Sequence, residues 1–538
     1  MTKRETSQFI IILLLFFIII TLLFMEVDQI EMDEIEINNK LSQPIFNKKN
    51  SKKQKKNSIS KKLIVGVIFA ITIIAFIFFN YIDGNINQTI EKNEKNEKKL
   101  SVEDKDGCEI GYKLIGDKCV INYSFKATYN TFKNDEIITL QRLFKSDKLK
   151  EMIVNGQKTR PSHKFLCSEK GKYIFHVLLK EDTIIEDLSE MFDNLVNLES
   201  VYFSELFNTE KVTKMNNMFR NCKSLKEIDL SNFNTKNVQR MDFMFSGCNS
   251  LTSLDLSNFS NDNLVNLNHM LLNCHSLETI NLTNFMTPKV EDMSYLFSNC
   301  EDIKTLDLSS FYTKKVKTMK GMFERCKSLI YVNIKFFNTE NVKDMSYMFN
   351  KCYSLIQIDS SKFYAPNVES MISMFYSCKA LVELDLSNFV GTKVRELDNF
   401  IEGCSSLSTI NMANFNAPEL QKMDYLFYFL TSLTSVNLTN FGTTSVKSMN
   451  GMFQGCSKLK EVDLSSFDTK NVASMVDMFN GCSVMRKIGI SNFDTQNLQF
   501  MQRMFDNCPS LKGIRMNKKS VSKFEKKIPS NITLIEYD

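Results

Sequence analysis

Apolar and polar residues follow one fixed order that recurs between residues 190 and 516. Positions are counted from the cysteine that opens each copy, and Cys222 opens the first full copy. Apolar residues stand at +3, +6 and +8, and the two-residue step between +6 and +8 is typical of a strand with one buried face. Position +11 is phenylalanine in every full copy: Phe233, Phe259, Phe285, Phe311, Phe337, Phe363, Phe389, Phe415, Phe441, Phe467 and Phe493.

The second half of each copy has a different period. Its apolar residues stand at +16, +19, +22, +23 and +26, which in the first copy are Val238, Met241, Met244, Phe245 and Cys248. Spacings of three, three, one and three residues place such side chains along one stripe of a helix. Threonine is frequent at +13, a suitable N-cap, and proline occurs at +14, the first helical position. The pattern therefore predicts a short helix in each copy.

A column of cysteines sets the length of the copies at 26 residues, with one interval of 52 residues in which Leu430 takes the place of the missing cysteine. This cysteine column consists of Cys222, Cys248, Cys274, Cys300, Cys326, Cys352, Cys378, Cys404, Cys456, Cys482 and Cys508. A repeat of this length indicates a solenoid, because one unit cannot bury its apolar face alone. We therefore predict an α/β fold of about 12–13 strand-turn-helix units, with a parallel sheet on one face and helices on the other.

The run L-x-x-I-x-L-x-x-F resembles a leucine-rich repeat. The fuller segments "SNFNTKNVQRMDFMFSGC" and "SSFDTKNVASMVDMFNGC" closely resemble the BspA-like repeats of bacterial and protist surface proteins, over about residues 190–516. The resemblance implies a leucine-rich-repeat solenoid on a cell-surface protein that binds or adheres and is not an enzyme. One departure is clear: the standard repeat has Asn or Cys where this chain has Phe at +11, and its asparagines lie one position earlier, as in Asn232, Asn258 and Asn284.

Two apolar runs of 17 residues, Phe9–Met25 and Leu63–Phe79, precede the repeats. Both are at the lower end of membrane-spanning length. The second run predicts a transmembrane helix over residues 63–80. Eight lysines between Lys48 and Lys62 favour the cytosolic side of that span, so the chain after it is expected outside the cell.

The first run leaves three interpretations open. It is a second span, a cleaved signal peptide, or a stretch upstream of a translation start at Met25 or Met32. As it stands in the sequence, residues 1–62 are an N-terminal tail that contains this run and ends in the lysine-rich segment. The membrane, through one or two N-terminal spans, is thus a predicted partner of the chain.

The chain beyond the span divides into four predicted parts: a charged flexible stalk (81–107), a β-rich cap (108–189), the solenoid (190–516) and a C-terminal tail (517–538). The stalk is nearly devoid of large apolar groups. The cap is expected to cover the first coil of the solenoid, since an open end would expose core. Within the cap, Cys108 and Cys119 are spaced as in a small disulfide loop of an extracellular module.

Composition and motifs argue against nucleic-acid binding and against catalysis, but they do not identify the function. The chain has 538 residues, a net charge of +5 and 43% apolar residues, which is ordinary for a folded protein and gives no strong field for nucleic acid. No G-x-S-x-G, phosphate loop, H-E-x-x-H or kinase motif occurs, so we expect no enzyme, no cofactor and no metal site. Six sequons are candidates for glycosylation: Asn87, Asn122, Asn258, Asn281, Asn437 and Asn531.

Two columns are candidates for chemistry. The cysteine column is interpreted as a buried ladder of small apolar thiols, because stacked side chains with parallel directions do not converge into disulfides. Position +7 forms a polar stripe on the open face of the predicted strands: Asp229, Asp255, Asn281, Asp307, Asn333, Asp359, Asp385, Asn411, Asn437 and Asp463. This stripe is either a ligand face suited to sugar hydroxyls or cations, or a solvent residue copied along with the repeat.

Three hypotheses for the function follow. The first is a membrane-anchored surface protein, with its repeats outside the cell, that binds extracellular protein or glycan partners by many weak contacts. The second is a structural coat or spacer protein without a defined ligand. The third is an intracellular repeat scaffold, in which both apolar runs have been misinterpreted.

Overall fold

The computed structural model describes residues 108, 111–115, 118–494, 496–517 and 533–537. The chain divides into two units, 1–101 and 102–538, and all described residues belong to the second. The predictions for 1–62, 63–80 and 81–107 concern residues outside this described part and stay predictions. Among the residues that are described, no helix has the length and apolar character needed to cross a membrane.

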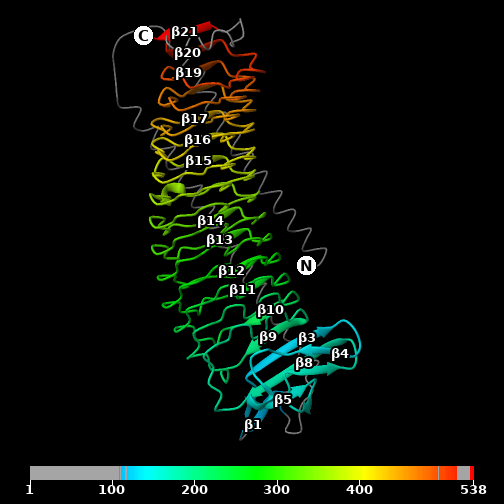
Figure 1. Cartoon of the computed structure of the whole chain (residues 1–538). Helices are drawn as coiled ribbons and strands as arrows, with labels where there is room; N and C mark the ends of the chain where they lie inside the picture. The colour runs from blue at the N-terminus through cyan, green and yellow to red at the C-terminus, as the bar shows by residue number, and fades with distance from the viewer. Residues whose placement is uncertain (1–107, 109–110, 116–117, 495, 518–532, 538) are drawn as a thin grey trace, which may run out of the picture. The chain divides into compact units, whose positions relative to one another are not determined.

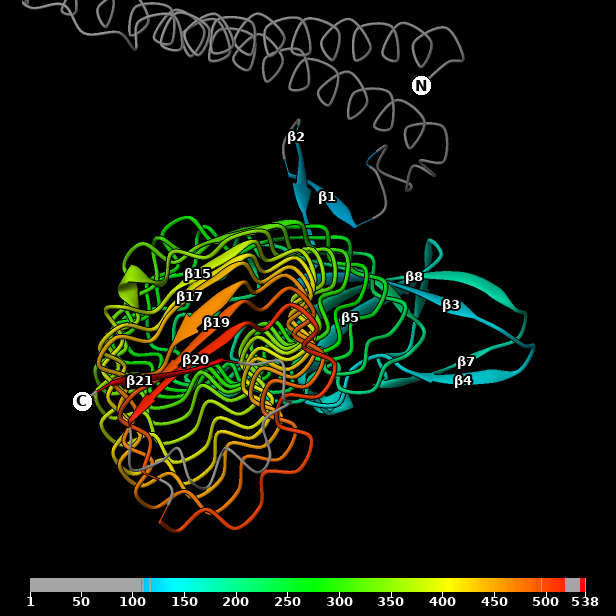
Figure 2. The same cartoon turned by 90° about the horizontal axis from the view of Figure 1, so that it is seen from above.

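The repeats form a solenoid of about 12 coils. The coils lie one above another from β9 to β20 in Figure 1, and they overlay when viewed along the stack in Figure 2. The strands of the solenoid are short: β9 (Leu198–Phe203), β10 (Glu227–Asp229), β11 (Ser253–Asp255), β12 (Thr279–Asn281), β13 (Thr305–Asp307), β14 (Tyr331–Asn333), β15 (Glu383–Asp385), β16 (Thr409–Asn411), β17 (Ser435–Asn437), β18 (Glu461–Asp463), β19 (Lys487–Ile490) and β20 (Gly513–Asn517).

Neighbouring strands pair in parallel with equivalent positions opposite each other. Leu254 of β11 lies opposite Ile280 of β12, and Ile410 of β16 lies opposite Val436 of β17. Because the coils from Cys222 onward all have 26 residues, like side chains meet like from coil to coil. The predicted parallel stacking is therefore confirmed, and only the nature of the second half of each coil differs from the prediction.

The core consists of two columns of phenylalanine. The first phenylalanine column, at +11, is buried in every copy from Phe233 to Phe493. The second phenylalanine column, at +23, has rings that stack face to face on those of adjacent coils, as between Phe323 and Phe349 (centroids 5.1 Å apart, planes at 14°) and between Phe349 and Phe375 (5.4 Å, 3°). Stacked rings thus form an interior spine in three blocks, which Leu271 and Ile401 separate.

The α/β fold class is wrong. In the described part of the chain the only helices are two 3₁₀ turns of three residues, η2 (Ser146–Lys148) and η3 (Ser360–Lys362). The stretch expected to be helical consists of two tandem β-turns in each coil. In the first coil Met244 N–H donates to Met241 O (3.2 Å) and Cys248 N–H donates to Phe245 O (3.0 Å).

The backbone conformation explains why no helix forms. The third residue of each turn has a positive φ, as in Phe243 (57°) and Gly247 (77°), which is the signature of a type II turn. Two left-handed residues, four positions apart, are incompatible with a right-handed helix. Each turn brings the chain back to the core every three residues, so tandem turns produce the same spacing of apolar residues as one helical stripe.

A backbone ladder joins the tandem turns of adjacent coils. The N–H groups at +19, +21, +23 and +25 donate to carbonyl groups of the next coil, as from Phe245 to Met270 (2.9 Å) and from Gly247 to Leu272 (2.7 Å). A fifth bond runs from the N–H at +17 to the carbonyl at +17 of the preceding coil, as from Gln239 to Thr213 (2.8 Å). We call these five bonds the turn ladder.

The threonine at +13 is not an N-cap, as had been predicted, but a clamp between coils. Thr313 is buried, its Oγ1 donates to Asn338 O (2.9 Å) and it accepts from Asn338 N–H (2.6 Å). Asparagine side chains add a second set of links at +15, where Asn341 Nδ2 donates to Lys314 O (2.8 Å). At +10, Asn232 Nδ2 donates to Phe203 O (2.9 Å), so the asparagines one position before Phe also tie coils together.

One coil carries asparagine in the threonine column, and this suggests a stabilising substitution. Asn261 is 1% exposed, and neither its Oδ1 nor its Nδ2 has a hydrogen-bond partner. We expect Asn261→Thr to raise the free energy of unfolding by about 1 kcal/mol, because it replaces an unsatisfied amide with a clamp. The measurement is the urea midpoint. The reverse exchange one coil earlier, Thr235→Asn, is the matched control and should lower it; a lower midpoint for Asn261→Thr would contradict the clamp.

A β-rich region, called the cap, precedes the solenoid and covers its first coil. Its strands are β1 (Tyr112–Ile115), β2 (Lys118–Ile121), β3 (Phe125–Thr131), β4 (Glu136–Thr139), β5 (Leu149–Val154), β6 (Gln157–Thr159), β7 (Lys164–Cys167) and β8 (Gly171–Leu179). β3 pairs antiparallel with β9, so a six-stranded sheet in the order β10-β9-β3-β8-β5-β6 runs from the cap into the solenoid. At the other end β21 (Thr533–Tyr537) pairs in parallel with β20.

Candidate functional site

The polar stripe at +7 has a structural role in all ten coils. In each coil the side-chain Oδ1 accepts a hydrogen bond from the backbone N–H two residues later, as Asp307 does from Ser309 (3.0 Å) and Asn333 does from Lys335 (3.2 Å). The full set comprises the residues from Asp229 to Asp463. Asp and Asn are favoured there because they form the turn that ends each strand. Their use as a ligand face stays a prediction.

The amides in this stripe also lower the electrostatic cost of stacking carboxylates. Asn333 Nδ2 donates to Asp307 Oδ1 (2.9 Å). The hydrogen bonds from Ser309, followed by the one from Asn333, hold the pKa of Asp307 below its usual value, and Ser387 with Asn411 does the same for Asp385. These carboxylates are therefore ionised at neutral pH, and both residues are exposed.

The cysteine column is buried and unbridged, as interpreted from the sequence. Each thiol donates to the carbonyl of the residue at +23 in an earlier coil, as Cys326 Sγ does to Phe297 O (3.1 Å). Burial raises the pKa of Cys274 and of Cys456 to about 12. A neutral thiol is a poor nucleophile and a poor metal ligand, so this column supports packing and not chemistry.

The other predicted site residues are the cysteines of the disulfide loop and the asparagines of the sequons. Cys108 and Cys119 form a disulfide that closes the loop of β1 and β2. Asn258 uses its Nδ2 to bond the carbonyls of Leu230, Ser231 and Phe233, so its amide is engaged in the fold. The sequons at Asn87 and Asn531 lie outside the described residues, and glycosylation of any sequon stays a prediction. In the described part of the chain no group of three or more His, Cys, Asp or Glu is arranged to hold a metal.

Large apolar side chains are exposed on the central coils, and the sequence analysis did not single them out. Seven residues, between 40% and 56% exposed, flank strands β13 to β15 and are called the central apolar set: Ile330, Tyr331, Ile356 and Val382 at or before the strand positions, and Tyr312, Phe336 and Tyr364 after them. Other coils have Lys226, Thr252 or Asn234 at the equivalent positions. A comparison of exposed columns between copies would have identified this set.

The same coils carry an excess of positive charge. Residues 304–382 contain 12 Lys and Arg and 6 Asp and Glu, a net charge of +6, against +5 for the whole chain. Lys335 Nζ lies 5.2 Å from the centre of the Phe336 ring, and Lys314 and Lys315 are exposed next to Tyr312 in the chain. Exposed aromatic rings beside lysines are suited to a partner with flat apolar faces and anionic groups.

These features define a class of protein: a leucine-rich-repeat solenoid of the β type, capped at its first coil, with one surface that differs from the rest. The chain belongs to the family described as "Mycoplasma protein of unknown function, DUF285". The family model matches residues 186–306, 291–415 and 421–528, which is more than half of the chain.

Several solved structures resemble this chain. A leucine-rich repeat protein from Bacteroides ovatus ATCC 8483 is 18% identical, with a TM-score of 0.40 over 68% of this chain and 89% of that one. A leucine rich cell surface protein from Faecalibacterium prausnitzii A2-165 is 17% identical, with a TM-score of 0.31 over 65% and 86% of the two chains. No curated protein matches the chain. The resemblance to leucine-rich repeat surface proteins is confirmed.

Proposed function

We propose that this protein is a cell-surface binding protein that is held in the membrane by its N-terminal region and presents the solenoid to an extracellular partner. The observation that carries the proposal is the central apolar set, because a soluble solenoid gains nothing by exposing Tyr312, Phe336 and Tyr364 together. Non-catalytic function is part of the same proposal, since the columns of the repeat are occupied by packing and turn residues.

Of the two classes of partner, protein and glycan, the chemistry of the central apolar set and its neighbouring lysines favours an anionic glycan. Tyr312 and Tyr364 occupy the same position two coils apart, which is about 9.6 Å along the stack. Aromatic side chains stack on the apolar faces of sugar rings, and the neighbouring lysines pair with carboxylate or sulfate groups.

Binding to heparin and to uncharged dextran tests this proposal. We expect the full chain to bind heparin, and Tyr312→Ala with Tyr364→Ala to weaken that binding about thirtyfold, because two stacking contacts of about 1 kcal/mol each sum to about 2 kcal/mol. Phe132 is an aromatic residue in the cap that is more exposed than either tyrosine, so Phe132→Ala is the control and should bind as the parent does. Equal binding by the double variant and the control would refute the assignment of this surface.

The polar stripe is tested separately by removing charge without removing the turn. Asp307→Asn with Asp359→Asn keeps the Oδ1 acceptor, since asparagine already occupies this column at Asn333. We expect the folded structure to be unchanged and affinity for a neutral glycan to be altered only if the stripe contacts the ligand. Unchanged binding to every glycan tested would exclude the stripe as the ligand face.

Location and anchoring need their own measurement. Protease added to intact cells should cleave the repeat region if it lies outside, whereas full protection would favour an intracellular scaffold.

A spacer that polymerises end to end is disfavoured by the cap, because β3 and the strands beyond it already cover the first edge of the solenoid sheet. Light scattering of the purified protein should accordingly show no growing assemblies without a partner.

A further inference from the structure

One joint between coils lacks the turn ladder. Among the described coils, every other joint from residue 188 to residue 506 has its inter-coil backbone bonds at +19, +21, +23 and +25, as between Phe375 and Phe400 (2.8 Å) or Phe427 and Met452 (2.9 Å). None of these bonds forms between residues 397–403 and residues 422–428, and the fifth, from Gln421 to Arg395, is also missing. The line of parallel bridges is interrupted at the same place, between Glu396 and Lys422. We call this joint the seam.

The opposite side of the same two coils is intact. β15 and β16 remain paired in parallel, and β16 pairs with β17. Ser408 N–H donates to Val382 O (2.8 Å) across the same joint. The coils are therefore held together along the strands and separated along the turns, so the seam is open on one side only.

The sequence explains why the ladder fails at this point. Leu430 replaces the cysteine whose smaller thiol elsewhere donates to the carbonyl of the preceding coil, and Ile401 replaces the phenylalanine of the second phenylalanine column. The ring of Phe400 lies edge-on to Phe375 (84°) instead of stacking. Leu271 also replaces a phenylalanine of that column, yet its joint keeps the ladder, so the loss requires more than one substitution.

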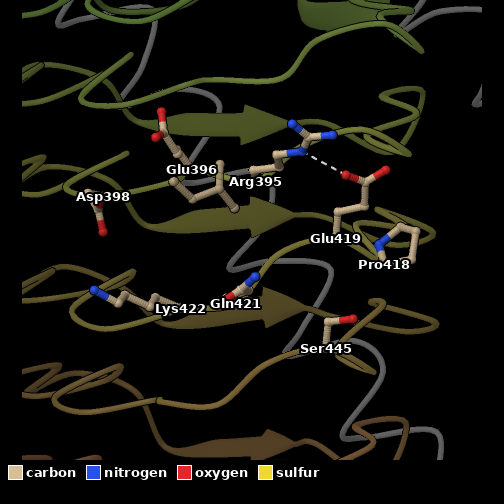
Figure 3. Close-up of a pocket in the computed structure, with 9 residues that line it drawn as sticks. Arg395, Glu396, Asp398, Pro418, Glu419, Gln421, Lys422 and Ser445 are labelled. Atoms are coloured by element: carbon tan, nitrogen blue, oxygen red, sulfur yellow. Dashed lines mark hydrogen bonds and ion pairs between the residues drawn. The ribbon is translucent and has the colours of Figure 1, made fainter.

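A cavity of about 520 Å³ opens at the seam. Its wall includes Arg395, Glu396, Leu397 and Asp398 from one coil and Pro418, Glu419, Gln421 and Lys422 from the next. Figure 3 shows Arg395 and Glu419 facing each other at one end of the cavity, joined by a hydrogen bond from Nε to Oε2 (2.7 Å), and Asp398 and Lys422 at the other end. The volume is within the range of ligand pockets in proteins.

Main-chain groups along the seam are left without their ladder partners, and those of Leu397, Gln421 and Lys422 belong to residues of the cavity wall. The N–H groups of Leu397, Asn399 and Ile401 recur at a two-residue step, as do the carbonyl groups of Lys422 and Asp424 opposite them. Backbone donors and acceptors at this spacing match the edge of an extended peptide, which offers N–H and C=O groups at the same step. A glycan has no such alternation, and the mixture of two cations and three carboxylates favours a ligand with charges of both signs.

We propose that the seam binds a short extended peptide, whose main chain takes the place of the missing ladder bonds at Leu397 and Gln421 and whose charged groups pair with Arg395, Lys422 and the carboxylates beside them. This is strand addition between two coils of a solenoid. The seam lies in the turns of the coils and not at the central apolar set, so the proposal is independent of glycan binding there.

Hydrogen exchange of the full chain, resolved by mass spectrometry, tests the proposal. The amides of residues 397–403 should exchange faster than those of 371–377, which have a complete ladder. The tripeptides Lys-Ala-Glu and Glu-Ala-Lys at millimolar concentration should slow exchange at 397–403 about tenfold, and the trisaccharide maltotriose should not. No slowing with either tripeptide would overturn the proposal and leave a hydrated hinge.

Variants separate the site from the fold. Arg395→Ala with Lys422→Ala removes two exposed charges, so the exchange of the free protein should be unchanged while the slowing by peptide is lost. Ile401→Phe with Leu430→Cys should restore the ladder, slow exchange without peptide and abolish the peptide effect. Leu271→Phe is the matched control, because its joint is already closed. Undiminished peptide protection in the surface variant would also contradict the proposal.

Discussion

Raising the pH from 7.5 to 10 should destabilise the solenoid far more than an ordinary domain of this size. Ten thiols of the cysteine column have a pKa raised mainly by burial: Cys222, Cys248, Cys274, Cys300, Cys326, Cys352, Cys378, Cys456, Cys482 and Cys508. In the unfolded chain a cysteine has a pKa of about 8.5. Their stabilising effect is therefore complete below pH 8.5 and is lost as the pH rises toward the folded-state values.

The size of the loss in unfolding free energy follows from the difference between the thiol pKa values of the unfolded and the folded chain. At pH 10 each unfolded thiol gains about 2 kcal/mol by ionising, and ten of them together amount to about 20 kcal/mol if the solenoid unfolds as a unit. The measurement is the urea midpoint by circular dichroism, in reducing buffer, at both pH values. We expect a large fall in the midpoint at pH 10.

A triple variant separates the effect of thiol ionisation on stability from that of lysines and tyrosines, which titrate in the same pH range. Cys300→Ala, Cys326→Ala and Cys352→Ala together remove three of the ten groups, so about 6 kcal/mol of the loss between the two pH values should disappear. The packing cost of the substitutions is present at both pH values and cancels in the difference. An identical dependence on pH in parent and variant would show that the buried thiols are not responsible.

Phe349→Ala should be the most costly single substitution in the second phenylalanine column. Its ring is fully buried and stacks on Phe323 and Phe375 at 5.1 and 5.4 Å, so its removal leaves a cavity between three coils. We expect a loss of about 3–5 kcal/mol, measured as the urea midpoint at neutral pH. Phe349→Leu should cost less, because Leu271 already fills this column in another coil.

The exposed ring of Phe336 provides the comparison. Its side chain is 56% exposed, so Phe336→Ala should change the free energy of unfolding by about 0.5 kcal/mol or less. Losses of equal size for Phe336 and Phe349 would mean that stacking in the core contributes little to stability.

The repeat length, the strand positions and the burial of the columns could be predicted from the sequence. A column such as Phe233 to Phe493 specifies its own stacking, because identical coils place identical side chains in contact. The cap over the first coil followed from the need to cover an open sheet edge. These predictions depend on periodicity alone, which a single chain with many copies displays in full.

The helix could not be rejected from apolar spacing, since tandem turns and a helix bury residues at the same intervals. The distinguishing signal was present at +25, immediately before the cysteine, where Gly247, Asn273, Asn299 and Gly403 have positive φ. Glycine and asparagine at one fixed position of a supposed helix favour left-handed backbone. The seam was marked by Leu430, but whether a missing cysteine opens a joint or merely changes its packing depends on neighbours in the next coil.

β3 pairs antiparallel with β9 and so covers one end of the solenoid, and the copies from Cys222 onward all have 26 residues. These two features affect how such chains can change in length. A whole unit can be gained or lost from the interior while both end pieces still meet a coil of the same outline. Recombination between near-identical copies would thus yield longer or shorter descendants that fold in the same way, each with the joint near Leu430 at a different number of coils from the cap.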